Sequence, residues 1–119
     1  MSKVFAFTLI IISSIFISAS CSKSGSGGGG TSLDCNTVSN KAFAADVNPT
    51  IQSSCAIGGC HDAASTNGPG PLLTYAQVFN ARTTIQSAVS AGSMPKTGSI
   101  STSQKNSILC WIQSGAPNN

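Results

Sequence analysis

The chain has 119 residues, of which only 8% are charged, and six lysines and arginines against three acidic residues give it a formal net charge of +3. The basic residues form no cluster, which argues against a nucleic-acid-binding protein, because such proteins need a basic patch or stripe. The three carboxylates lie far apart in sequence, so the chain does not favour an enzyme that works through paired carboxylates.

The N-terminus has the features of an export signal. An apolar run over residues 4–17 follows Lys3, and it is too short and too serine-broken for a membrane-spanning helix. Small residues then precede Cys21, a pattern that resembles the lipobox of bacterial lipoproteins, in which this cysteine is lipid-modified. We therefore expect residues 1–20 to be a lipoprotein signal peptide. Ordinary secretion with an unmodified Cys21 is the alternative.

The segment after the signal divides into a tether and a domain. Residues 21–34 begin with Cys21 and are rich in glycine and serine, which predicts a flexible spacer. Residues 35–119 have the length of one small domain. An apolar core of that size is marginal, and small exported folds usually add disulfides, metals or a prosthetic group. We expect the domain to lie on the periplasmic or cell-surface side, anchored to a membrane by lipid.

Helix signals begin early in the domain. Ser39 is a candidate cap for a short turn. Asn48 followed by Pro49 is a cap and first-turn pair, which predicts a helix that runs into Cys55. The glycine- and proline-rich residues 62–73 predict a loop.

The middle of the domain predicts two further helical stretches. Thr74 can cap the first stretch, YAQVFNA. The second stretch, RTTIQSAVSAG, has Ile85 and Val89 four residues apart and Gly92 as its stop.

The last helix has the clearest signals. Ser101 and Gln104 form a capping box, Trp111 and Ile112 lie on its apolar face, and Gly115 ends it. Strand-like alternation is hard to find, so we expect an all-α domain of about four short helices joined by long loops. A large apolar prosthetic group in the core would explain such loops.

The motif CAIGGCH places Cys55, Cys60 and His61, the only histidine, within seven residues. A cysteine followed directly by histidine ends the attachment signature of c-type haem. The two thiols add to haem vinyl groups as thioethers, and the adjacent imidazole is thereby held beneath the iron as a ligand. Four residues separate the cysteines instead of the usual two, and Gly58 and Gly59 can take positive φ values that let the longer loop bulge.

Other interpretations of this motif remain. A disulfide between Cys55 and Cys60 leaves His61 without a role. A zinc or copper site is a second alternative, but tetrahedral zinc needs four ligands and adjacent residues rarely reach one ion. A nucleophilic cysteine–histidine pair is a third, and no orienting group is identifiable for it. We favour one covalent haem c.

Met94 is the only methionine apart from the initiator, and it lies in the loop AGSMPKTG between Gly92 and Pro95. Methionine and histidine are the ligand pair of the cytochromes c, in which methionine raises the reduction potential. Met94 is therefore the candidate second axial ligand to the iron. The alternative is a methionine that fills a gap in the core.

Two cysteines remain once Cys21 is assigned to lipid and the motif cysteines to haem. Cys35 and Cys110 flank the domain, and we expect them to form a disulfide. Two free buried thiols are the alternative, which an oxidising compartment disfavours.

The segments DVNPTIQSSCAIGGCH, LLTYAQVF, AGSMPKTGSIS and ILCWIQSGAPNN together resemble the small mono-haem domains of class I cytochrome c in bacterial exported proteins. The resemblance covers nearly all of the chain after the spacer. It implies an all-α fold wrapped around covalent haem, with His61 as the proximal and Met94 as the distal ligand. It also implies a backbone carbonyl that orients the imidazole, for which Pro69 and Pro71 are candidates, and it places Trp111 beside the haem pocket. A purely structural Trp111 is the alternative.

The function implied by the resemblance is electron transfer between redox partner proteins near the membrane, with no enzymatic activity. The competing hypothesis is a disulfide-stapled lipoprotein that binds a metal or a protein partner without haem. Neither the electron donor nor the acceptor follows from the sequence.

Overall fold

The computed structural model describes residues 32–119 of the chain. The predicted signal peptide, Cys21 and nearly all of the tether lie outside the described residues. Within residues 32–119 the chain is helical and has no strand. The elements in order are a π-helix η1 (Phe43–Val47) and three α-helices, α1 (Asn48–Ser54), α2 (Tyr75–Ser90) and α3 (Thr102–Gln113).

The first two elements are continuous with each other. The predicted short turn is the π-helix η1, which is preceded by Ala42 and has no side-chain cap. The prediction that Asn48 caps the next helix is wrong, because Asn48 is the first residue of α1 and Val47 occupies the capping position. Pro49 still lies in the first turn, where a missing N–H costs no helical hydrogen bond. The helix ends at Cys55, as predicted.

Helix α2 corrects the prediction of two separate stretches. It is one helix of 16 residues, and Val78, Ala81, Ile85 and Val89 form its buried face. No glycine or proline interrupts this segment, so one continuous apolar stripe keeps it helical. The expected count of about four short helices is therefore not confirmed.

Both long helices begin with a capping box. The Ser101 hydroxyl of α3 accepts from the Gln104 N–H and the Gln104 side chain accepts from the Ser101 N–H, which confirms the predicted box. Thr74 caps α2 as predicted, and Gln77 completes a second box there. Each box satisfies two backbone donors that a helix otherwise leaves open.

An aromatic cluster occupies the core where η1, α2 and α3 meet. Phe43 and Trp111 have ring centroids 5.3 Å apart, and Tyr75 lies edge-on to Phe43 at 5.0 Å. Trp111 is fully buried and its indole N–H donates to the carbonyl of Pro117 at 2.8 Å. The hydroxyl of Tyr75 donates to the carbonyl of Ala116 at 2.9 Å, so the same rings hold the C-terminal tail.

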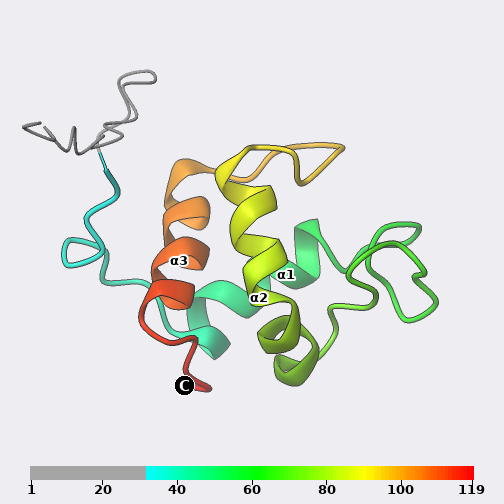
Figure 1. Cartoon of the computed structure of the whole chain (residues 1–119), viewed down its shortest axis with the longest axis horizontal. Coiled ribbons are helices and arrows are strands. Elements are labelled where there is room, and N and C mark those ends of the chain that lie inside the picture. The colour runs from blue at the N-terminus through cyan, green and yellow to red at the C-terminus, as the bar shows by residue number, and fades with distance from the viewer. Residues whose placement is uncertain (1–31) are drawn as a thin grey trace, which may run out of the picture. The chain divides into compact units, whose positions relative to one another are not determined.

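The predicted disulfide between Cys35 and Cys110 is present, and it joins the start of the domain to α3 across 75 residues of sequence. Cys110 is fully buried. Figure 1 shows α2 and α3 side by side, with the loop that joins them at the top of the view and the long loops between α1 and α2 projecting to the right. No helix of residues 32–119 is long and apolar enough to cross a membrane.

Candidate functional site

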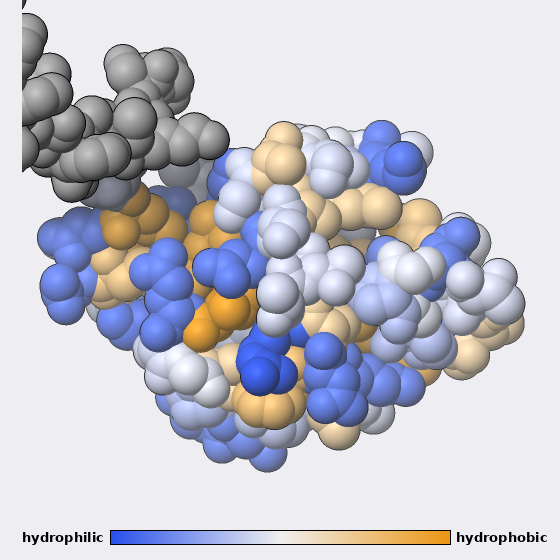
Figure 2. Space-filling view, in the orientation of Figure 1, coloured by the Kyte–Doolittle hydropathy of each residue, from blue (hydrophilic) through white to orange (hydrophobic). Residues whose placement is uncertain are grey.

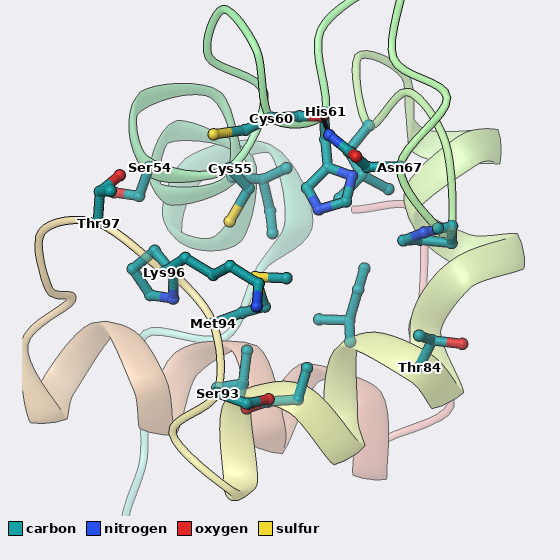
Figure 3. A pocket seen from close by; sticks show the side chains of 18 of the residues that line it. Ser54, Cys55, Cys60, His61, Asn67, Thr84, Ser93, Met94, Lys96 and Thr97 are labelled. Carbon is teal, nitrogen blue, oxygen red and sulfur yellow. Dashed lines mark hydrogen bonds between the residues drawn. The ribbon is translucent and has the colours of Figure 1, made fainter.

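A cavity of about 550 Å³ is lined by helices α1 and α2, by the loop that follows α1 and by the loop that follows α2. Its apolar wall is built by Ile51 of α1, Leu72 of the loop, and Ile85, Ala88 and Val89 of α2. The cavity also contains the candidate residues Cys55, Cys60, His61 and Met94 (Figure 3). In Figure 2, apolar residues show at the surface where the upper loop and the right-hand loops approach each other.

Cys55 and Cys60 lie at the upper edge of this cavity in Figure 3. Both are half-buried free thiols, so the alternative disulfide between them is not formed. Cys55 follows the last turn of α1 and its sulfur points into the cavity, whereas the sulfur of Cys60 points sideways along the edge. Burial raises the pKa of the Cys55 thiol above its ordinary value, and the nearby Cys60 adds to that rise.

The loop between the two cysteines is closed by backbone hydrogen bonds. The N–H of His61 donates to the carbonyl of Cys55 and the N–H of Cys60 donates to that of Ile57, each at 3.0 Å. Of the two adjacent glycines, Gly59 has the predicted positive φ, at 78°. The longer spacer therefore folds as a compact bulge that keeps the two cysteines on the same side of the cavity.

His61 is 7% exposed and its ring is directed into the cavity (Figure 3). Its Nδ1 lies 2.9 Å from the carbonyl oxygen of Gly70. A carbonyl oxygen can only accept, so Nδ1 is the donor, and the tautomer with this proton has its lone pair on Nε2. The expectation that Pro69 or Pro71 supplies this carbonyl is wrong, because the accepting residue is Gly70 between them.

Gly70 has a backbone conformation that favours glycine. Its φ is 94°, and its carbonyl faces the imidazole. The N–H of Leu72 returns a hydrogen bond to the His61 carbonyl at 3.0 Å. The loop thus binds both the imidazole and the backbone carbonyl of His61.

Met94 lies on the other side of the cavity from His61, in the loop that follows α2 (Figure 3). Gly92 has a φ of 67° and ends the helix, as predicted, and Pro95 follows the methionine. Met94 is half-buried, so it lines the cavity without belonging to the apolar core. Among the described residues that line this cavity, Lys96 is the only lysine, arginine, aspartate or glutamate.

Trp111 is not part of the cavity wall. It belongs to the aromatic cluster with Phe43 and Tyr75, so the expectation that it lies beside the pocket is wrong and the structural alternative holds. In residues 32–119, no three side chains of histidine, cysteine, aspartate or glutamate gather closely enough to share a metal ion. The alternative of a zinc site therefore lacks its ligand set.

Sequence reasoning missed the polar side chains that follow the histidine. Asp62, Ser65 and Asn67 fold back onto Gly59 and Cys60 through hydrogen bonds. The available signal was a run of short polar residues directly after a glycine-containing bulge, since such side chains bond readily to nearby backbone groups.

Comparisons with protein-family models, with curated proteins and with solved structures each give no match for this chain.

Proposed function

We propose that residues 35–119 form an electron-transfer domain that carries one covalently bound c-type haem, with Cys55 and Cys60 as thioether attachment points and His61 and Met94 as axial ligands. The observation that carries the proposal is the arrangement of His61. Its lone pair is presented to a cavity that has two free thiols beside the imidazole and a thioether on the far side.

The cavity suits a large apolar ring. Its volume of about 550 Å³ lies in the range of roughly 300–1,000 Å³ that is usual for small-molecule and cofactor sites. Aliphatic side chains from α1, α2 and the loop form its wall, and their apolar surface is stabilised when a ring displaces water. The Cys60 thiol reaches the cavity only after rotation about its own side-chain bond, since its sulfur points along the edge.

The chain's own residues set the properties of the iron site. The hydrogen bond from Nδ1 to Gly70 fixes the tautomer and orientation of His61 and makes Nε2 a stronger ligand. A methionine ligand favours ferrous iron and raises the potential. The haem supplies one-electron redox chemistry when bound. If His61 and Met94 both bind the iron, no iron position would be left for a substrate, and the domain would then transfer electrons and would not act as an enzyme.

The proposal includes export and anchoring. Residues 1–20 act as the signal peptide, Cys21 carries the lipid, and residues 21–34 let the domain move between redox partner proteins near the membrane. The disulfide between Cys35 and Cys110 supports an exported location, because structural disulfides persist in oxidising compartments.

The proposal is tested by producing the full chain in a bacterial host with haem-attachment machinery. We expect a haem absorption band that remains with the protein after denaturation and acid-acetone extraction, because thioethers do not dissociate. The control is Cys55→Ser/Cys60→Ser, which keeps His61 and Met94 and should release any haem on extraction. A colourless wild-type protein contradicts the proposal and favours the haem-free, disulfide-stapled lipoprotein.

A further inference from the structure

The carboxylate of Asp62 bridges the two sides of the cysteine–histidine motif. One carboxylate oxygen accepts from the backbone N–H of Gly59 at 3.0 Å, and the other accepts from the N–H of Ala64 at 3.1 Å. Hydrogen bonds to a charged acceptor are stronger than those between neutral groups. Asp62 therefore links the end of the spacer to the residues after His61.

The side chain of Asn67 holds the same segment from its other side. Its amide donates to the carbonyl of Gly59 at 3.3 Å and to the carbonyl of Cys60 at 3.0 Å. The hydroxyl of Ser65 also donates to the Cys60 carbonyl. The N–H of Gly59 and the carbonyls of Gly59 and Cys60 are thus all bonded to side chains that come later in the chain.

The two glycines of this segment add little packing to these hydrogen bonds. A Cβ atom placed on Gly59 meets nothing within 4 Å, and one placed on Gly58 meets only the Asp62 carboxylate at 4.0 Å. Two adjacent glycines lose more backbone entropy on ordering than other residues do. Cys55 differs, because it continues directly from the last turn of α1. The segment that carries Cys60 is held by backbone hydrogen bonds to Ile57 and Cys55, and in addition by the side chains of Asp62, at Gly59, and of Asn67, at Gly59 and Cys60.

We propose that Asp62 and Asn67 are positioning residues that hold the backbone of Cys60 in place for thioether formation and so offset the two extra residues of the spacer. This inference rests on the proposed function. In the attachment step the S–H bond of Cys60 adds across a vinyl C=C bond: sulfur bonds to one vinyl carbon, the hydrogen goes to the other, and no oxidant or reductant is consumed. A fixed Cys60 backbone leaves only rotation of the side chain before this reaction.

The test is Asp62→Asn in the full chain, produced with haem-attachment machinery. An amide keeps one acceptor and places an N–H donor where the second oxygen stood, so one of the two backbone bonds is lost. We expect haem bound through Cys55 alone to increase roughly tenfold relative to wild type, the low end of the factor that corresponds to losing one hydrogen bond to a charged acceptor. Asn67→Ala should also increase the amount of haem that is bound through Cys55 alone.

Attachment at each cysteine is measured separately. One or two thioethers give the same total mass, so free Cys60 is counted by alkylating the reduced, unfolded protein and mapping its peptides. The pyridine haemochrome band should also move to longer wavelength, because one vinyl group remains conjugated. Asp34→Asn is the matched control: it removes the same charge, and Asp34 bonds only within its own turn through Asn36 and Thr37.

The outcomes separate this inference from the proposed function. If Asp62→Asn and Asn67→Ala keep two thioethers as fully as Asp34→Asn, or lose Cys55 and Cys60 attachment equally, the positioning role is overturned while the cytochrome proposal stands. If the wild-type chain carries no covalent haem, the proposed function fails and the positioning role falls with it.

Discussion

The two ends of the domain are stabilised in different ways. At the aromatic end, formed by η1, α3 and the C-terminal tail, the rings of Phe43 and Trp111 are in contact and a disulfide attaches the start of the domain. The cavity end is formed by residues 55–72 and 91–100. Its loops are stabilised by backbone hydrogen bonds and turn at glycines with positive φ. Figure 1 shows these loops at the top and right of the view, away from the C-terminus.

This difference indicates that the two ends of the domain have different roles. The aromatic end is well packed, because Phe43 and Trp111 are buried, and the Trp111 indole and the hydroxyl of the half-buried Tyr75 are hydrogen-bonded to the tail. The cavity end encloses about 550 Å³ behind aliphatic walls and presents a histidine lone pair to that space. We infer that folding stability comes mainly from the aromatic end, and the cavity end is where the proposed haem would bind.

The largest expected effect tests whether folding stability comes mainly from the aromatic end. Cysteines are removed from each end of the haem-free chain in turn. Cys35→Ala/Cys110→Ala should lower the free energy of unfolding by about 4 kcal/mol, the chain-entropy value for a loop of 75 residues. Cys55→Ala/Cys60→Ala is the matched pair and should change it by less than about 1 kcal/mol, because both thiols are half-buried and unbridged. Urea denaturation measures both. Equal losses from the two pairs would contradict this inference.

The second prediction concerns Met94 and the potential of the haem-loaded protein. Met94→Ala should keep covalent haem, because Cys55, Cys60 and His61 are unchanged, and should lower the potential by on the order of 100 mV, within the roughly 0.8 V range that axial ligands span. The far-red charge-transfer band of ferric iron bound to methionine should disappear, and cyanide should bind more readily. Redox titration and absorption spectra check this.

The control for Met94 lies on the neighbouring helix. Val89→Ala also shortens an apolar side chain that lines the cavity, but it provides no ligand atom. It should cost some stability through the lost burial and should keep the charge-transfer band. If wild type lacks that band, or if Met94→Ala leaves the potential and spectrum unchanged, Met94 is a packing residue and not a ligand.

What the sequence could predict depends on how local the determining interaction is. The capping box of Ser101 and Gln104 involves residues three apart, and the sequence alone was sufficient to find it. The pairing of Cys35 with Cys110 followed from counting, since the other cysteines had assignments. The continuity of α2 was missed, because it depends on a buried face that runs past the middle of the predicted stretches.

The candidate site follows the same rule. Cys55, Cys60 and His61 are close in sequence, so their proximity could be predicted from the motif. The carbonyl that orients His61 could not, because it depends on the loop backbone: the carbonyl of Gly70, whose φ is 94°, lies beside the imidazole, and the sequence does not say which carbonyl of the loop will do so. The predicted position of Trp111 beside the cavity is wrong, because an apolar helix face does not determine which part of the core it packs against.

The smallest expected effect concerns the charge at the cavity end. Lys96 lines the cavity beside Met94, is exposed, and has no hydrogen-bond acceptor among the described residues (Figure 3). A positive charge near the iron favours the ferrous state, so Lys96→Gln should lower the potential. Solvent screens an exposed lysine, and an interaction of about 0.5 kcal/mol corresponds to roughly 20 mV for one electron.

Lys105→Gln is the matched control for Lys96→Gln. It removes the same charge, but Lys105 lies on α3, donates to the carbonyl of Ser90 at 3.2 Å and does not line the cavity. Redox titration at low salt should show the larger decrease for Lys96→Gln, and the difference should diminish at 1 M salt, where the screening length is about 3 Å. An equal decrease for both variants would mean that only net charge matters. The cavity end would then present no specific electrostatic environment to its cofactor, and its contribution to the potential would come from the axial ligands alone.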